Sequence, residues 1–278
     1  MGSRLRPLAG APVPAFVAFA TGRPYHPRML ARTRLALVGT LVALAALAWW
    51  WTAVRMDGMD AGPGTDPGTL GFFVSTWVVM MAAMMFPATA PMVVAYSELG
   101  RGRRWWTALF IAGYLLLWAA AGLAAYGLLE LGRALAGGLF TWDRAGRWSA
   151  GGVLALAAIY EFTPLKVACL RRCREPVGFL TTEWRDGRAG ALRMGAVHGA
   201  WCLGCCWALM AGLFALGAMS VFWMVVIALL ITMEKLLPWR VLATTGVAVV
   251  LAVLAIGVAA APAQVPGLTL PSQMEMPG

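Results

Sequence analysis

The stretch MGAVHGAWCLGCCWALMAGLFAL, residues 194–216, is long enough to cross a membrane as a helix and carries no charged side chain. About 20 residues span the hydrocarbon core of a bilayer, at a helical rise of roughly 1.5 Å per residue. The same stretch holds one of the chain's two histidines and three of its five cysteines. It therefore predicts a transmembrane helix that carries chemistry.

Six further apolar runs surround this stretch in the sequence. The 278 residues are 61% hydrophobic and 12% charged, and a soluble domain of this length cannot bury so much apolar surface. We therefore predict an all-α fold, a polytopic transmembrane helical bundle of about seven helices. The runs cover residues 35–54, 70–96, 105–129, 149–170, 194–216, 219–237 and 241–261.

Two of these runs have distinctive features. The run at 149–170 is interrupted by Glu161, Pro164 and Lys166, so it either spans the membrane or re-enters it. The runs at 194–216 and 219–237 meet near Gly217, which predicts a tight helical hairpin.

Basic residues indicate how the bundle is oriented. With a cytoplasmic N-terminus, 18 of the 22 Lys and Arg residues fall on the cytoplasmic side and four on the other. Such asymmetry is the usual orientation signal of membrane proteins, so the net charge of +10 does not indicate nucleic-acid binding. We predict a basic cytoplasmic arm at 1–34, the bundle at 35–262 in the lipid bilayer, and a short outer tail at 263–278.

The central stretch places soft metal ligands on one helical face. His198, Cys202, Cys205 and Cys206 fall within an arc of about 100° at 100° per residue. Thiolates suit Cu(I), and thiolates with imidazole also suit Zn(II). These four residues are therefore expected to be the primary ligands of an intramembrane metal site, or else to be buried packing residues.

Other candidate ligands lie on three of the remaining runs or, for Cys173, just after one of them. Methionines facing the cysteines would favour Cu(I) over Zn(II), because zinc has little use for thioethers. Glu234 is expected to be a ligand, a proton acceptor or an interfacial anchor, while Lys235 beside it is expected to reach the membrane surface. The candidates are Met80, Met81, Met84, Met85, Cys169, Cys173 and Glu234.

Four motifs together resemble a bacterial family of predicted metal-binding integral membrane proteins, the DUF2182 family. The resemblance covers roughly residues 70–240 and implies a multi-pass protein of the bacterial cytoplasmic membrane, with a metal site built from the cysteine motifs. It implies no reaction, and copper is inferred from ligand softness alone. The motifs are MAAMMFPATAPM (81–92), TPLKVACLRRCREPVGF (163–179), GALRMGAVHGAWCLGCCWALM (190–210) and EKLLP (234–238).

Three functions fit these observations. The first is a non-enzymatic Cu(I)-handling protein that transports copper or delivers it to a copper enzyme, with a copper chaperone or that client as partner. The second is a thiol–disulfide oxidoreductase using Cys202 with Cys205 and shuttling through Cys169 with Cys173. No cysteine is predicted in an outer loop, which counts against the second. The third is a cofactor-free assembly subunit with inert cysteines.

Overall fold

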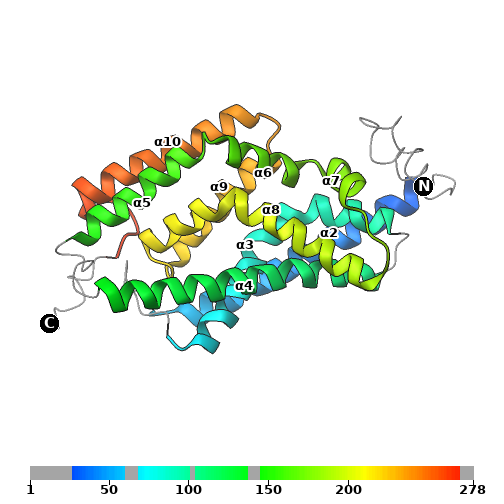
Figure 1. The fold of residues 1–278 in the computed structure, drawn as a ribbon, viewed down its shortest axis with the longest axis horizontal. Coiled ribbons are helices and arrows are strands. Elements are labelled where there is room, and N and C mark those ends of the chain that lie inside the picture. Colours follow the sequence, from blue (N-terminus) through cyan, green and yellow to red (C-terminus); the bar gives the residue numbers. More distant parts are fainter. Residues whose placement is uncertain (1–26, 60–67, 101–103, 137–144, 270–278) are drawn as a thin grey trace.

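A computed structural model describes residues 27–59, 68–100, 104–136 and 145–269, and all regular structure in these ranges is helical (Figure 1). The predicted all-α architecture is therefore confirmed. The helices are α2 (Pro27–Met56), α3 (Leu70–Leu99), α4 (Arg104–Ala136), α5 (Arg147–Tyr160), α6 (Pro164–Arg174), α7 (Pro176–Glu183), α8 (Gly187–Leu216), α9 (Val221–Leu236), α10 (Arg240–Ala260) and the 3₁₀ helix η3 (Pro262–Gln264).

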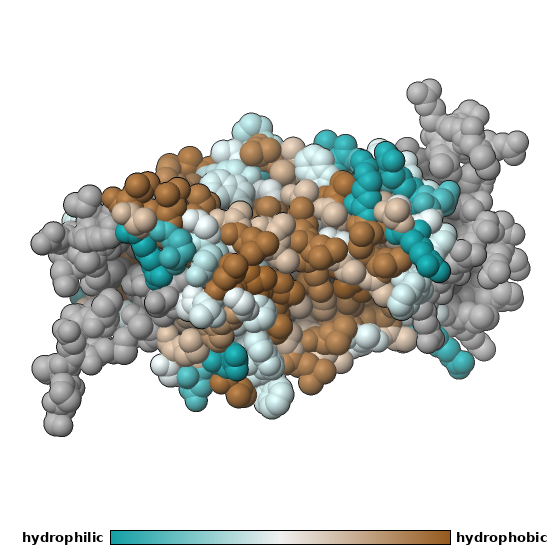
Figure 2. All heavy atoms as spheres, turned by 60° about the horizontal axis from the view of Figure 1, so that its bottom comes forward, coloured by the Kyte–Doolittle hydropathy of each residue, from teal (hydrophilic) through white to brown (hydrophobic). Residues whose placement is uncertain are grey.

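Five of these helices are long and apolar enough to cross a membrane, namely α2 from Arg32 onward, α3, α4, α8 and α10. A sixth span results if α5 and α6, which meet at a bend of 67°, are one broken segment. The helix α9 has only 16 residues and reaches about 24 Å, less than the roughly 30 Å hydrocarbon core. The chain is thus a multi-pass membrane protein, and Figure 2 shows apolar residues covering the middle of one face.

The first helix begins earlier than its apolar run. It starts at Pro27, so the last eight residues of the predicted arm are helical, while residues 1–26 lie outside the described part. Proline is well suited to the first helical turn, because its missing N–H has no partner there in any case. Further along α2, Arg34 pairs with the buried carboxylate of Glu98 at the end of α3, which ties the two helices together.

The break between α5 and α6 is encoded locally. Thr163 precedes Pro164 and adopts extended backbone angles, as the residue before a proline usually does. The Thr163 hydroxyl then accepts a hydrogen bond from the Lys166 N–H at 3.3 Å, which caps the new helix. The run at 149–170 is therefore two helices, and α6 leaves at an angle that turns its side chains toward α8 and α9.

Two glycines let α4 and α8 cross in backbone contact. A Cβ on Gly195 would lie 1.9 Å from the carbonyl oxygen of Phe110, and one on Gly113 would lie 2.0 Å from that of Leu192. Small residues are how membrane helices approach closely. The crossing brings Tyr114 of α4 against the cysteine-bearing face of α8.

The predicted hairpin after α8 is confirmed. Gly217 has φ of +114°, a conformation that favours glycine, and its carbonyl accepts a hydrogen bond from the Ser220 N–H at 3.1 Å. The chain then returns as α9, whose C-terminal turn faces α6 and α8.

Candidate metal centre

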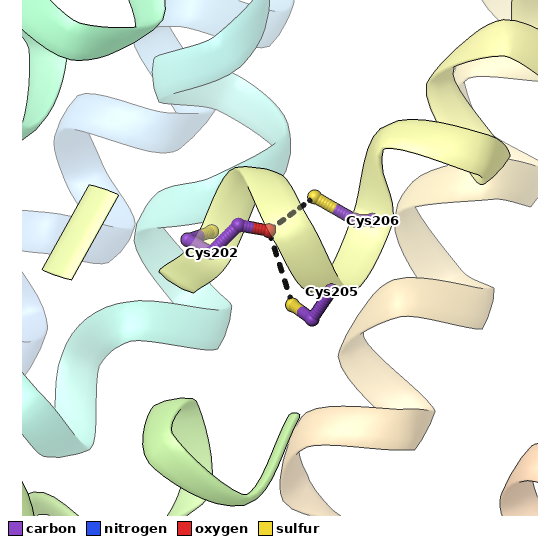
Figure 3. Close-up of side chains that lie close together, drawn as sticks. All are labelled: Cys202, Cys205 and Cys206. Carbon is purple, nitrogen blue, oxygen red and sulfur yellow. Dashed lines mark hydrogen bonds between the residues drawn. The ribbon is translucent and has the colours of Figure 1, made fainter. Parts of the chain in front are cut away.

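Three thiols of α8 form one compact, buried cluster. The Sγ atoms of Cys202, Cys205 and Cys206 all lie within 4.8 Å of one another, and each residue is at most 2% exposed. The cluster follows from spacing alone, because residues three and four apart share a helical face. The thiols of Cys205 and Cys206 both hydrogen-bond to the Cys202 carbonyl oxygen, at 3.1 and 2.9 Å (Figure 3).

Two residues from other helices contact the Cys202 sulfur. The Tyr114 hydroxyl of α4 lies 3.0 Å from it, and the Lys235 ammonium of α9 lies 2.9 Å from it. The prediction that Lys235 reaches the membrane surface is wrong, because this side chain turns inward and is only 7% exposed. The sequence predicted neither contact. For Lys235 the one available signal was a Lys next to a Glu at the end of an apolar run, and for Tyr114 there was none.

A fourth thiol approaches from α6. The sulfur of Cys173 lies 3.8 Å from that of Cys205, and Cys173 is partly exposed whereas the other four cysteines are buried. One turn earlier, Cys169 packs against Gly204, where a Cβ would lie only 2.7 Å from the Cys169 sulfur. The two cysteines of CLRRC thus have different surroundings, one beside the cluster and one packed on the back of α8.

His198 lies one turn from Cys202 but outside the cluster. Among the described residues, the group of ligand atoms within 4.8 Å of one another comprises the three cysteines and not this imidazole. The ring is buried among Phe110, Tyr114 and Phe179, with centroid distances of 6.0, 5.8 and 5.4 Å. Its Nδ1 atom makes no hydrogen bond.

The four predicted methionines of α3 are all buried in the apolar cluster that also contains the three cysteines. The sulfur of Met85 lies 4.0 Å from the Lys235 ammonium, which itself contacts Cys202. Met80 lines a small apolar cavity of about 20 Å³ beside Trp77 and Met219, whereas Met81 and Met84 fill the core around it. Of the four, Met85 is the thioether that the described contacts connect to the cysteine cluster.

Glu234 belongs to a different polar cluster. The Lys166 ammonium lies 2.8 Å from a carboxylate oxygen of Glu161 and 2.8 Å from one of Glu234, and all three side chains are at most 2% exposed. Arg174 of α6 also donates to the backbone carbonyls of Glu234 and Leu237. This ion cluster joins the α5–α6 break to the end of α9, and buried charges inside a membrane need such partners.

The donor set around the three cysteines is sulfur-rich. Cys173 and Met85 add a thiol and a thioether at its edge, while the nearby carboxylates are engaged with Lys166. Such a set matches a soft ion such as copper rather than Mg²⁺ or Ca²⁺, which require oxygen ligands. The three buried thiols are close enough together to serve as ligands of one soft metal ion.

Comparison with known proteins identifies the family. No curated protein and no solved structure matches the chain. The family model PpoB2, described as a copper chaperone, matches residues 74–258, a span that includes all five cysteines and the four methionines above. Since this match covers more than half of the sequence and agrees with the buried cysteine cluster, the chain belongs to the PpoB2 copper chaperone family, historically DUF2182.

Proposed function

We propose that this protein is an integral membrane copper chaperone that holds Cu(I) at Cys202, Cys205 and Cys206 and delivers it to a copper enzyme during assembly. The observation that carries the proposal is the single buried cluster of three thiols, whose sulfur atoms lie within 4.8 Å of one another. Thiolate sulfur is the ligand that suits Cu(I) best among physiological ions. Zn(II), which also takes thiolates, is the competing occupant.

The position of Lys235 supports the proposal that buried thiolates bind a monovalent copper ion. Two thiolates around one Cu(I) carry a net negative charge, which is costly to bury without a counter-charge. The Lys235 ammonium, 2.9 Å from the Cys202 sulfur, supplies that charge and donates a hydrogen bond. The Tyr114 hydroxyl, 3.0 Å from the same sulfur, can donate a second hydrogen bond to a Cys202 thiolate, so Cys202 is the sulfur of the cluster with two such partners.

Cys173 and Met85 are proposed as exchange ligands at the edge of the cluster. Cys173 is the partly exposed thiol, so it offers an incoming or departing ion a sulfur on the way to the buried three. Cys169, His198 and Glu234 are proposed to act around the site rather than on the metal. Their contacts are with Gly204, with aromatic rings and with Lys166, respectively.

The proposed topology has seven crossings with the N-terminus in the cytoplasm of a bacterial cell and the bundle in its cytoplasmic membrane. It counts α5 with α6 as one broken span and α9 as a short one. Support comes from the hairpin at Gly217, which returns α9 alongside α8, and from the basic residues that cluster on one side. Cys173, flanked by Arg172 and Arg174, then lies toward the cytoplasm.

The test is metal content. Detergent-purified protein, loaded with Cu(I) under reducing conditions, is analysed by metal mass spectrometry as wild type and as the Cys202→Ser, Cys205→Ser, Cys206→Ser triple variant. Cys169→Ser is the matched control, because it removes a buried thiol of the neighbouring helix outside the cluster. We expect copper in wild type and control and none in the triple variant, with helix content unchanged.

A triple variant that keeps its copper, or a wild type that takes up none, would contradict the proposal. Zinc retained in place of copper and lost in the triple variant would keep the site and reassign its metal. Delivery is tested separately, by measuring copper incorporation into a copper oxidase co-expressed with wild type or with the triple variant. Equal incorporation would contradict a chaperone role.

A further inference from the structure

One thiol of a different helix approaches the cysteine cluster of α8. The sulfur of Cys173 on α6 lies 3.8 Å from the sulfur of Cys205 on α8. Cys202, Cys205 and Cys206 are instead neighbours within α8, where the helical backbone holds their side chains apart. A disulfide requires its two sulfurs to approach to about 2.05 Å. The cross-helix pair is the one that reaches this distance by a shift of α6 toward α8.

The segment that carries Cys173 is short and bounded by bends. α6 has 11 residues, follows the 67° bend after α5, and ends at Glu175, where the backbone leaves helical angles before α7. Its register along α8 is set by Cys169, which sits over Gly204. The closing distance, from 3.8 Å to about 2.05 Å, is small enough for a local shift of α6 that keeps the contacts of Lys166 and Arg174 with α9.

Access distinguishes Cys173 from the other thiols. It is partly exposed, whereas Cys205 is 2% exposed and the remaining three are buried. Arg171 and Arg172 directly precede it in the chain, the first exposed and the second stacked over the ring of Trp201 at 5.6 Å. A small disulfide that carries carboxylates, such as oxidised glutathione, is expected to be drawn to these arginines and to meet Cys173 before the buried thiols.

We propose that Cys173 and Cys205 form a reversible disulfide and that its formation releases the copper ion. The Cys173 sulfur attacks one sulfur of the small disulfide, breaking its S–S bond and releasing one small thiolate. The Cys205 sulfur then attacks the Cys173 sulfur, forming the Cys173–Cys205 bond and releasing the second thiolate. In the metal-free protein the protons lost by the two cysteines go to the two small thiolates. In the copper-loaded protein Cys205 gives up Cu(I) instead of a proton, and the second small thiolate takes up that Cu(I).

Copper release follows because Cys205 is one of the three thiols of the cluster. Once its sulfur is bonded to Cys173, it no longer offers a thiolate, and Cys202 with Cys206 retain the ion less tightly. Two electrons pass to the small disulfide and the copper ion leaves as Cu(I). The release step rests on the proposed function, whereas disulfide formation does not.

The experiment treats metal-free and Cu(I)-loaded full-length protein with oxidised glutathione, in detergent and without oxygen. Intact mass, digestion mapping and metal mass spectrometry are read on the same samples. We expect a loss of two hydrogen atoms, a linked peptide joining Cys173 to Cys205, and loss of more than half of the bound copper. A reducing agent should restore both the mass and copper binding.

Two matched variants isolate the pair. Cys173→Ser removes one partner of the pair and also an exchange ligand, so its copper content is measured before the oxidant is added; it should form no internal disulfide, and the copper that it has loaded should stay bound in the oxidant. Cys169→Ser changes the other thiol of the same helix and should behave as wild type. If α6 moves too little, the linked peptide will be missing or will join other cysteines, and the proposal is overturned.

The outcomes separate the two proposals. A Cys173–Cys205 link with copper retained overturns the release step and leaves the copper site intact. If the Cys173–Cys205 disulfide forms in a protein that never takes up copper, the proposed function and the release step are both overturned. Only the disulfide itself is then supported. A copper-loaded protein that forms no link overturns the disulfide and leaves the proposed function standing.

Discussion

One face of α8 carries His198 at one end and the cysteines, beginning with Cys202, at the other, and the two ends have different surroundings. His198 and Cys202 are one turn apart on that face, and Tyr114 of α4 contacts both. Around His198 the neighbouring helices supply aromatic rings, and its Nδ1 atom has no hydrogen bond. Around Cys202 they supply an ammonium group and further sulfur. Sharing a helical face therefore does not place two residues in one site, because the adjacent helices decide the chemistry at each turn.

The largest effect expected is at the cysteine end. Cys202→Ser should lower Cu(I) affinity by more than roughly 100-fold, since changes around a metal ligand alone cost about 10–100-fold. Cys202 is the sulfur held by both Tyr114 and Lys235. Competition with a Cu(I) chelator measures the affinity. An affinity equal to wild type would mean that the other two thiols suffice.

The next largest effect is expected at the crossing of α4 and α8, which positions both His198 and Cys202. Gly195→Ala would place a Cβ against the Phe110 carbonyl oxygen, so α4 must move away, at a cost of roughly 1–3 kcal/mol. Thermal unfolding in detergent should show the loss. Gly152→Ala on α5 is the control, because a Cβ there meets no atom within 4 Å. Equal stability of the two variants would contradict the close crossing.

Removing the ammonium sharpens the comparison further. Lys235→Met keeps most of the side-chain volume but leaves the Cys202 thiolate without its counter-charge. We expect about tenfold weaker Cu(I) binding, the lower bound for changes around a ligand. Lys235→Arg, which keeps the charge, should bind more tightly than Lys235→Met. Stronger binding by the methionine variant would show that the lysine competes with the metal.

The smallest effect is expected at the histidine end. His198→Phe replaces one ring by another inside an aromatic cage, so copper content and affinity should stay unchanged while stability is maintained. Metal mass spectrometry and chelator competition check this. A marked loss of copper would place His198 among the ligands, as its position on the helical face predicts.

The sequence was most informative where a feature depends on one helix. The spacing of Cys202, Cys205 and Cys206 predicts their clustering, because it fixes their angles around α8. The hairpin at Gly217 and the break before Pro164 are likewise local, and both are as predicted. Helix ends were less well predicted, as the early start of α2 illustrates.

Contacts between helices were not predictable from the sequence. The approach of Lys235 to Cys202 joins residues 33 apart, and that of Tyr114 joins residues 88 apart. Both depend on how far one helix slides along another, which is set by residues such as Gly113 and Gly195. For the same reason, the sequence could not show that Glu234 pairs with Lys166 while Lys235 contacts the sulfur of Cys202.

The adjacency of Glu234 and Lys235 has a consequence for how this family can diverge. Successive residues of a helix point about 100° apart, and here each of the two points into a separate buried cluster. An insertion or deletion within α9 would rotate both charges away from their partners at once. The positions Phe222, Val225 and Leu229 are exposed, so they can vary among apolar residues. In related chains, the segment from the Gly217 turn to Lys235 should therefore vary in composition but keep its length.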